Sequence, residues 1–261
     1  MRYLILALFI PFISLAQADK SWNGKKCAVV LTYDDALNVH LDNVVPALDS
    51  LNLKATFYLS GYFPGCRQRL NDWRAVAEGG HELANHTLFH PCVGDRQGRE
   101  WVKPDYDLSK YTTTRLLDEL RMTNVLLESL DGKKKRTFAY PCGDTLAGGK
   151  SFVDAIRNEF IAARGVKSAL VKRNSINTFN VPAFGINGES GKQLIQLVKD
   201  ALEQRTLVVF LFHGVGGEHD LNVSLAAHRE LLKFLKENED DVWVAPFVDV
   251  MQFSNKNRTA Q

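Results

Sequence analysis

Two histidines, His86 and His90, stand four positions apart in the chain. On one helical turn or in a tight loop, this spacing lets both imidazoles face one direction and share a cation, although such a pair is also a common coincidence on protein surfaces. Asp35 supplies a third ligand if the first and third strands of the chain are neighbours. Two imidazoles and one carboxylate suit zinc or another borderline divalent metal with an open position, which is the catalytic pattern.

Two further side chains could move protons. Asp34 ends an apolar run just before Asp35 and could take a proton from an attacking water; alternatively, one of the two aspartates caps the following helix. His213 follows the very apolar segment 206–212 and is a natural general acid, or else a satisfied core histidine. The remaining histidines are assigned ordinary roles: His81 as a structural strand residue, and His40, His219 and His228 as surface or loop residues.

The elements that must position these residues alternate along the chain between short apolar segments and segments with apolar residues at helical spacing. This alternation predicts parallel strands with crossover helices, and about seven units favour a barrel over an open sheet. Strands are expected at 27–33, 54–60, 81–84, 135–140, 160–163, 206–212 and 242–245, and helices at 39–51, 71–78, 113–130, 152–158, 191–203 and 225–237.

A set of polar residues lies just past the C-terminal ends of these strands. In a (β/α) barrel, parallel strands deliver their following loops to one face, where catalytic residues gather. The residues are Asp34, Asp35, Asn85, His86, Pro141, Arg164 and His213. Their shared position predicts an active site at this rim.

The composition fits one ordinary domain at residues 19–261, with 45% hydrophobic and 24% charged residues, and a monomer is expected. A formal net charge of +2 lacks the basic excess of a nucleic-acid binder. Residues 1–18 have the order of a secretory leader, with Arg2, an apolar run over 3–15 and a small-x-small site at 16–18. The run is shorter than the ~20 apolar residues that a bilayer needs. We therefore expect a secreted or periplasmic protein without stable membrane insertion after cleavage.

Four cysteines permit disulfides in such an oxidising compartment. Cys66 and Cys92 both stand in turn-like, proline-containing segments, so a bridge between them is favoured among the three connectivities that four cysteines allow. Cys27 begins an apolar strand and is expected in the core. The absence of a Cys-x-x-Cys spacing argues against a structural zinc site.

From Cys27 to about Phe253, the chain resembles the polysaccharide deacetylases, the NodB-homology group also called carbohydrate esterase family 4. Residues 32–36 (TYDDA) resemble the family's first motif, Thr-Phe-Asp-Asp-Gly. Residues 80–90 (GHELANHTLFH) are similar to its second motif, which contains His-Ser/Thr-x-x-His, and residues 211–214 (LFHG) resemble its last, Leu-x-His. The resemblance implies a distorted (β/α)7 barrel of the NodB type.

The resemblance also implies an activity and a role for each matched residue. The activity is metal-dependent hydrolysis of the acetyl groups of an acetylated carbohydrate. Zinc is the favoured metal, with cobalt, nickel or manganese as alternatives. The roles are Asp34 as catalytic base, Asp35, His86 and His90 as metal ligands, His213 as general acid, and Leu211 as a wall of the pocket for the acetyl methyl group.

The chain departs from the family pattern at the third motif, Arg-x-Pro-Tyr. This motif aligns with residues 139–142 (AYPC), so Ala139 replaces the arginine that orients the base and Cys142 replaces the tyrosine. The tyrosine gives the oxyanion a backbone N–H, which survives any side chain. Tyr140, Pro141 and Cys142 are therefore retained as substrate-binding residues.

A second departure is that the Asp-Trp element of the fourth motif has no counterpart between Val166 and Asn187. For the missing arginine we hypothesise a replacement. Arg164, at the next strand end, would reach back to pair with Asp34 as part of the catalytic machinery; an ordinary surface salt bridge is the alternative.

Three functions remain open at this point: a metal-dependent carbohydrate deacetylase, a carbohydrate-binding relative that has lost catalysis, and a metal-dependent amidohydrolase acting on a non-sugar amide. Chitin-type oligomers, peptidoglycan and acetylated xylan are all compatible substrates, with either N-acetyl or O-acetyl groups. The loop 92–111 is long enough to wall a groove. Aromatic residues expected to be exposed and to stack on sugar rings are Trp22, Tyr62, Trp73, Trp101, Tyr106 and Tyr111.

Overall fold

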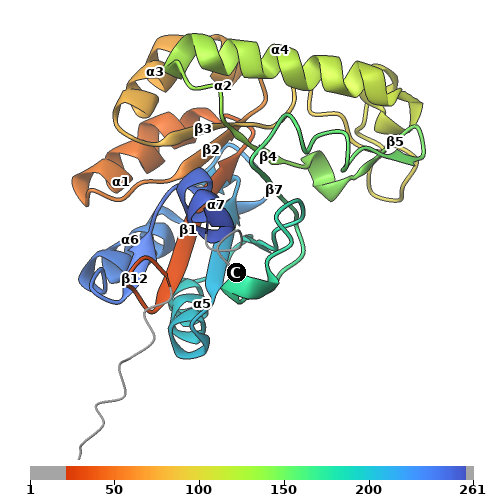
Figure 1. Ribbon diagram of the computed structural model, residues 1–261. Coiled ribbons are helices and arrows are strands. Elements are labelled where there is room, and N and C mark those ends of the chain that lie inside the picture. Colours follow the sequence, from red (N-terminus) through yellow and green to blue (C-terminus); the bar gives the residue numbers. More distant parts are fainter. Residues whose placement is uncertain (1–21, 257–261) are drawn as a thin grey trace, which may run out of the picture.

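A computed structural model of the chain describes residues 22–256, so the expected leader at residues 1–18 lies outside the described residues (Figure 1). Its main sheet has eight strands in the order β7-β4-β3-β2-β1-β9-β8, and β12 also pairs with β1. Every pairing in this sheet is parallel, as the alternation of strands and helices predicts. The bounds are β1 (Cys27–Asp34), β2 (Thr56–Leu59), β3 (Glu82–Asn85), β4 (Thr137–Ala139), β7 (Ala162–Arg164), β8 (Phe184–Gly185), β9 (Leu207–Phe212) and β12 (Val242–Val244).

The two edges of the sheet are joined by the segment 178–185. Its first part lies along β7, where the Ala163 N–H donates to the Thr178 carbonyl and the Gly165 N–H to the Val181 carbonyl, both at 2.9 Å. Its last part is β8, which pairs with β9. The sheet therefore curves into a distorted barrel, which confirms the fold class expected from the sequence.

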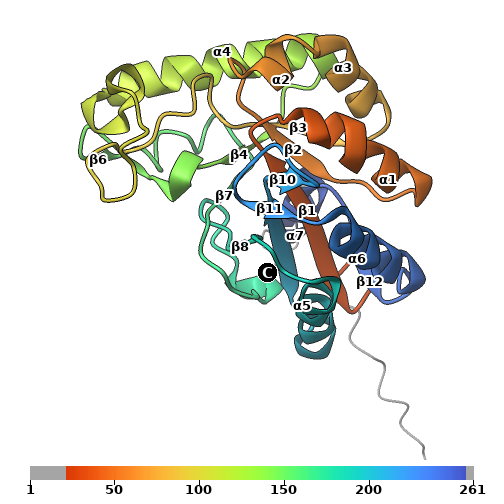
Figure 2. The same cartoon turned by 180° about the vertical axis from the view of Figure 1, so that it is seen from behind.

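Helices cover the outside of this barrel, with α3 and α4 along the top of the view in Figure 1, α6 at its lower left and α5 at its bottom; Figure 2 shows the same arrangement from behind. The helices are α1 (Val45–Ser50), α2 (Pro64–Arg67), α3 (Leu70–Glu78), α4 (Thr113–Asp131), α5 (Gly191–Gln204), α6 (Leu225–Glu237) and α7 (Phe247–Lys256). Side chains of Thr112, Ser190 and Ser224 cap the starts of α4, α5 and α6. None of the described helices is long and apolar enough to cross a membrane.

The strands carry two different hydrophobic faces. Along β1, Val29, Leu31 and Tyr33 belong to the cluster that packs against the covering helices, whereas Ala28 and Val30 belong to a cluster inside the barrel. Because successive side chains of a strand point to opposite faces, a continuous apolar run buries both sides at once. This is why the strands read as unbroken hydrophobic segments.

Helix α7 closes the end of the barrel opposite the C-terminal ends of the strands. Phe247 and Met251 belong to the interior cluster. The Phe247 N–H donates to Thr56 Oγ1 at 2.7 Å, and the Val248 N–H donates to Glu82 Oε2 at 2.9 Å. Thr56 and Glu82 are the first residues of β2 and β3, so α7 starts at the N-terminal ends of these strands.

The structure corrects the expected elements in several places. The helix expected at 152–158 is a series of turns, although Phe152 and Ile156, whose spacing suggested it, are both buried. Turns can bury a pair of side chains at this spacing as well as a helix can. The helix expected at 39–51 opens with a π-helical turn at His40–Val44. Strand β8 and helix α7 were not expected.

Candidate active site

The site is built from side chains that point inward at the C-terminal rim of the barrel. The period of two that places Ala28 and Val30 inside also turns Asp34 inward at the end of β1. On β9, the Leu211 side chain lies inside the barrel. His213 is two residues further on, directly after the strand, so its side chain points to the same inner face. The residues thus meet at the rim where the sequence placed them.

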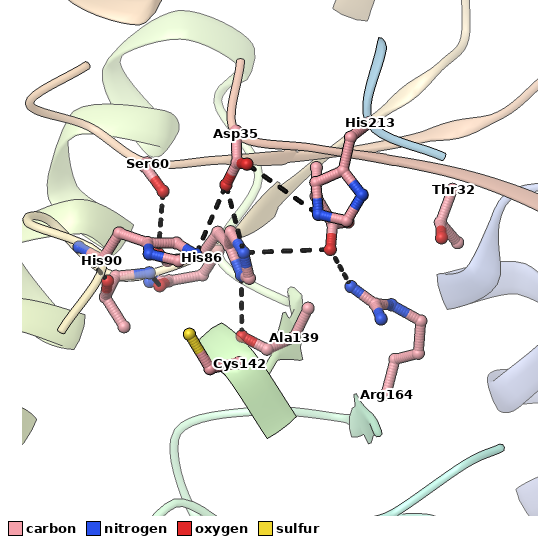
Figure 3. Close-up of polar contacts among 12 residues, drawn as sticks. Thr32, Asp35, Ser60, His86, His90, Ala139, Cys142, Arg164 and His213 are labelled. Carbon is pink, nitrogen blue, oxygen red and sulfur yellow. Dashed lines mark hydrogen bonds and ion pairs between the residues drawn. The ribbon is translucent and has the colours of Figure 1, made fainter. Parts of the chain in front are cut away.

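Asp35, His86 and His90 come together at this rim (Figure 3). Nε2 of His86 and Nε2 of His90 lie 3.5 Å and 3.4 Å from Asp35 Oδ1. A tetrahedral zinc ion with bonds of ~2.0–2.1 Å separates its ligand atoms by about 3.4 Å. Asp35 Oδ1 is buried and has no hydrogen-bond partner among residues 22–256. The three side chains therefore fit a divalent cation.

The first and third strands are not neighbours, because β2 lies between β1 and β3, so the strand contact on which the third ligand was conditional is absent from the described sheet. The ligands meet beyond the strands instead. The Asp35 N–H donates to the Tyr58 carbonyl and the His86 N–H to the Leu59 carbonyl, each at 3.1 Å. Successive carbonyls of β2 thus hold both residues, and Asp35, with a φ of 78°, turns back toward the histidines.

The two histidines share a tight loop, not a helix. Thr87 and His90 have positive φ angles of 66° and 55°. Asn85 Oδ1 accepts a hydrogen bond from the Thr87 N–H, and Thr87 Oγ1 accepts one from the His90 N–H, both at 2.8 Å. The imidazole centroids of His86 and His90 lie 4.8 Å apart. Asn85 therefore fixes the loop that presents both rings to Asp35.

The electrostatics of the cluster suit a metal ligand set. Burial alone would raise the pKa of Asp35, but His90, His86 and the other histidines around it outweigh burial and lower this pKa to about 2. Burial lowers the pKa of His86 to about 4, so its ring is neutral near pH 7. His86 Nδ1 donates to the Ala139 carbonyl at 2.9 Å. The lone pair of His86 Nε2 is therefore left facing Asp35.

Asp34 lies beside this cluster and is paired with Arg164. Nη2 of Arg164 donates to Asp34 Oδ2, and both side chains are buried. The guanidinium also lies 5.0 Å from the centroid of the Tyr58 ring. In the β4–β7 ladder, Arg164 is the direct partner of Ala139, the position where the family motif has its arginine. The guanidinium therefore comes from the neighbouring strand at the same level.

His213 faces Asp35 from the side opposite His86 and His90, with its Nε2 3.9 Å from Asp35 Oδ2 (Figure 3). Burial lowers the pKa of His213. Its Nδ1 is buried and has no hydrogen-bond partner in the part of the chain that the structure describes, which matches the missing fourth-motif aspartate.

His219, assigned to an ordinary surface or loop position, stacks on His213 with ring centroids 4.7 Å apart. Its Nδ1 accepts a hydrogen bond from the Leu221 N–H at 2.9 Å, which places the proton of the neutral ring on Nε2. Nε2 lies 3.8 Å from Asp35 Oδ2. His219 is therefore a stacking partner whose Nε2 carries the proton, and Asp35, His86 and His90 remain the better ligand set.

A cavity of about 330 Å³ opens over these groups. Of the four residues expected to bind substrate, Tyr140, Cys142 and Leu211 line the cavity, whereas Pro141 is buried and does not. The Tyr140 hydroxyl donates to the Phe179 carbonyl at 2.8 Å, so this side chain is a fixed wall. Exposed side chains of Trp101, Val166 and Leu221 complete the mouth.

The expected Cys66–Cys92 disulfide is wrong: Cys92 is bonded to Cys142. Cys92 follows β3 and Cys142 follows β4, and these adjacent parallel strands bring their loops to the same rim. Cys66 is buried in α2 on the outer side of the barrel and is free, as is the buried Cys27. The disulfide thus ties the loop of His90 to the loop of Cys142.

Several residues expected at the surface are buried. The His40 Nε2 donates to the His213 carbonyl at 2.8 Å, and His228 Nε2 is 2.7 Å from the Tyr33 hydroxyl, so both histidines are packed beneath the rim. Of the six aromatic residues expected to be exposed, Trp22, Trp73 and Tyr111 are buried, Tyr106 is half-buried, and Tyr62 and Trp101 are exposed. His81 is buried at the start of β3, in agreement with a structural role.

The fold and the site define a family. The model of the polysaccharide deacetylase family matches residues 22–154, just over half of the chain, and the chain belongs to this family. A chitooligosaccharide deacetylase of Rhizobium leguminosarum bv. phaseoli is 34% identical over 73 residues, which are 28% of this chain and 31% of that protein. The uncharacterized protein YlxY of Bacillus subtilis (strain 168) is 33% identical over 106 residues, 41% of this chain and 28% of that protein. The chain spans less than a third of the length of the curated relatives it matches.

Solved structures share the fold at low sequence identity. A Pseudomonas aeruginosa PAO1 protein described as a probable polysaccharide deacetylase superposes with a TM-score of 0.62 at 11% identity, covering 92% of this chain and 95% of that chain. PdaA of Bacillus subtilis, a family 4 carbohydrate esterase, superposes with a TM-score of 0.54 at 16% identity, covering 87% of this chain and 81% of that chain.

Proposed function

We propose that the chain is a metal-dependent hydrolase that removes acetyl groups from an acetylated carbohydrate. The observation that carries this proposal is the convergence in one cavity of the Asp35–His86–His90 ligand set, an aspartate held by a buried arginine, and a histidine on the opposite side. No serine or cysteine nucleophile is needed for this chemistry, because water is the attacking group.

In this proposal, each of the chain's own groups has a defined task. Asp34 accepts the proton of the attacking water, and Arg164 fixes the direction in which its carboxylate points. The Cys142 backbone N–H donates to the developing oxyanion, and Leu211 packs against the acetyl methyl group. His213 gives a proton to the departing amine or alcohol. A divalent cation held by Asp35, His86 and His90 would supply Lewis-acid polarisation of the acetyl carbonyl.

Zinc is the metal that we propose for this site, because two imidazoles and one carboxylate are its usual catalytic ligands, with cobalt, nickel or manganese as alternatives. The acetyl group is the N-acetyl of a GlcNAc-type sugar or the O-acetyl of a xylan-like polymer. The relative that acts on chitooligosaccharides supports the first.

We further propose that the chain works outside the cytoplasm. The leader-like sequence at residues 1–18 and the Cys92–Cys142 disulfide both support an oxidising compartment. Cell fractionation and N-terminal sequencing of the mature protein test this, with a start near Asp19 as the expected result. Recovery of an intact Met1 terminus from the cytoplasmic fraction would contradict it.

Acetate release tests the proposed activity. The purified chain without residues 1–18 is assayed on chitooligosaccharides, peptidoglycan and acetylated xylan, before and after chelation and after readdition of zinc. We expect chelation to abolish release and zinc to restore it, except in the Asp35→Asn variant, which loses a metal ligand. Release that continues undiminished in the fully chelated protein would overturn the metal-dependent proposal.

The same assay separates a second candidate, a carbohydrate-binding protein without catalysis. The unpartnered Nδ1 of His213 is the observation that favours this candidate, because the general acid lacks its orienting aspartate. Binding of an acetylated oligosaccharide to the zinc-loaded protein, without acetate release from any substrate, would decide for the binding protein.

A further inference from the structure

A second cleft, of about 270 Å³, opens beside the catalytic cavity; we call it the side cleft. Its walls include Tyr62, Arg67, Phe89, Trp101, Lys103 and Tyr106. His90 and Trp101 line both the side cleft and the catalytic cavity, so the two lie side by side and share a wall. A ligand with its acetyl group over the metal ligands can therefore extend into the side cleft.

The side cleft is an aromatic surface open to solvent. Within residues 22–256, Tyr62 and Trp101 are the exposed aromatic side chains, at 50% and 60% exposure, and both line it. Phe89 stacks on Tyr106 and meets Tyr62 edge to face, each with ring centroids 5.2 Å apart. Exposing such area to water is unfavourable, and the apolar C–H face of a sugar ring can cover it.

The side cleft is also positively charged. Arg67 and Lys103 line it, no carboxylate does, and neither cation has an ion-pair partner in the part of the chain that the structure describes. The catalytic cavity differs, because Asp34 and Asp35 line it and no lysine or arginine of the described chain does. A guanidinium and an ammonium over an aromatic floor are complementary to a carboxylate.

The loop that carries Trp101 is held in place. Arg99 pairs with the buried carboxylate of Asp144 and donates from Nη2 to the Cys142 carbonyl at 3.1 Å. Arg96 pairs with the other oxygen of Asp144 at 2.8 Å. The wall between the two cavities is therefore tied to the same turn that carries Cys142.

We propose that the side cleft binds a carboxylate-bearing sugar next to the acetylated sugar, so that the substrate is an acidic glycan. This inference rests on the proposed deacetylase function. Aromatic side chains receive the ring of the neighbouring sugar, and Arg67 and Lys103 pair with its carboxylate. A neutral acetylated oligosaccharide fills the same aromatic surface but leaves both cations unpaired.

The test compares two probes that differ only in charge. One is a tetrasaccharide of alternating N-acetylglucosamine and N-acetylmuramic acid, and the other is the same tetrasaccharide with its lactyl carboxylates converted to amides. Calorimetric titration uses the zinc-loaded Asp34→Asn chain, which retains the binding surface without the base. We expect the acidic probe to bind at least tenfold more tightly than the amide.

Charge variants locate this preference. Arg67→Gln and Lys103→Gln, each in the Asp34→Asn background, are expected to reduce the preference for the acidic probe over the amide to threefold or less. Arg74→Gln removes an exposed positive charge on α3 outside the side cleft and is expected to preserve it. Equal affinity for the two probes, or a preference unaffected by either cleft variant, overturns the inference.

The proposed function is tested separately, by measuring acetate release from each probe by the unsubstituted chain. If the chain releases acetate equally well from both probes, the deacetylase stands and the side-cleft inference fails. If the acidic probe binds preferentially and no substrate releases acetate, the side cleft stands and the proposed deacetylase fails.

Discussion

Arg164 illustrates how a single side chain can keep its place in a site while its sequence position changes. The family motif has an arginine at the position of Ala139, and Arg164 is the residue paired with Ala139 across the β4–β7 ladder. Two strand ends at the same level reach the same point inside a barrel, so either can deliver a guanidinium to Asp34. The sequence allowed this pairing to be predicted, because Arg164 ends a strand next to a motif that lacks its arginine.

His219 could not be found in the same way. It stands six residues after His213 in a glycine-rich loop, with no spacing that indicates a ligand or a base. It reaches the site because Gly216 and Gly217 adopt φ angles of 78° and 137°, which fold the loop back, and because the Leu221 N–H fixes the ring. Such a return depends on backbone geometry that residue types alone do not specify.

Stacking on His219 is expected to orient His213, whose Nδ1 has no hydrogen-bond partner among the described residues. We predict that His219→Ala lowers kcat/KM roughly 3- to 10-fold, the range that corresponds to a ring-stacking energy. His219→Phe retains an aromatic ring and should stay within about twofold of the unsubstituted chain. Steady-state kinetics on the best substrate checks this. A Phe variant as impaired as the Ala variant would show that the Nε2–H, and not stacking, is what matters.

Buried histidines predict a loss of stability in acid. Burial lowers the pKa of His228 from 6.5 to about 3, so at intermediate pH the unfolded chain binds a proton that the folded chain does not. Acidification from pH 7 to 5 therefore favours unfolding by roughly 2 kcal/mol through this histidine. In His228→Gln, the decrease in the free energy of unfolding between pH 7 and pH 5 should therefore be smaller than in the unsubstituted chain by about 2 kcal/mol.

Urea unfolding at pH 8, 7 and 5 measures this difference. Lys233→Gln, on the exposed side of the same helix, serves as the control and should retain the full acid dependence. An identical pH slope in His228→Gln and the unsubstituted chain would contradict the assignment.

At the level of secondary-structure elements, the order of strands and helices could largely be predicted, because the long apolar runs form strands and the segments with helical spacing form helices. The pairing of elements was not. Cys66 and Cys92 both stand in turn-like segments, yet the bond joins Cys92 to Cys142, because β3 and β4 are neighbours in the barrel. Likewise, Asp35 meets His86 across β2, a relation that appears only once the strand order is known.

The Cys92–Cys142 bond is predicted to stabilise the rim. It closes a loop with a sequence separation of 50, for which the chain-entropy account gives about 4 kcal/mol, and native disulfides typically contribute 2–4 kcal/mol. The double variant Cys92→Ser/Cys142→Ser should therefore unfold at lower denaturant concentration than the unsubstituted chain. Peptide mapping without reductant checks the pairing directly.

The double variant also provides the control, because reductant should destabilise the unsubstituted chain and leave the double variant unchanged. A cross-linked peptide that contains Cys66, or further destabilisation of the double variant by reductant, would show that the pairing is different.

At the scale of the whole molecule, the two ends of the barrel have different tasks. The C-terminal rim carries the residues that we propose as ligand set, base and acid, and the opposite end is closed by α7, with Phe247 and Met251 in the interior cluster. The buried Glu82 bonds to Thr56, Thr137 and the Val248 N–H at that closed end. The proposed chemistry and this buried hydrogen-bond network therefore lie at opposite ends of the barrel.

This separation predicts the effect of a cavity at the closed end. Phe247→Ala removes a fully buried ring and should cost about 3–5 kcal/mol of unfolding free energy, while kcat/KM of the folded protein stays within about threefold. Gln252→Ala on the same helix is the matched control and should change neither quantity appreciably. Denaturant unfolding and kinetics on the same samples decide; a fall in kcat/KM far beyond threefold in folded Phe247→Ala would show that the two ends are coupled.

In the proposed function, this site performs the family's hydrolysis with Arg164 in place of the arginine missing at Ala139. The direct measurement is kcat/KM for acetate release by Arg164→Ala and by the double variant Arg164→Ala/Ala139→Arg, with thermal unfolding to confirm that both are folded. We predict a loss of about 100-fold in the single variant, because the base is no longer held in position, and recovery of at least tenfold in the double variant. A folded Arg164→Ala protein with undiminished kcat/KM would show that Arg164 does not replace the missing arginine.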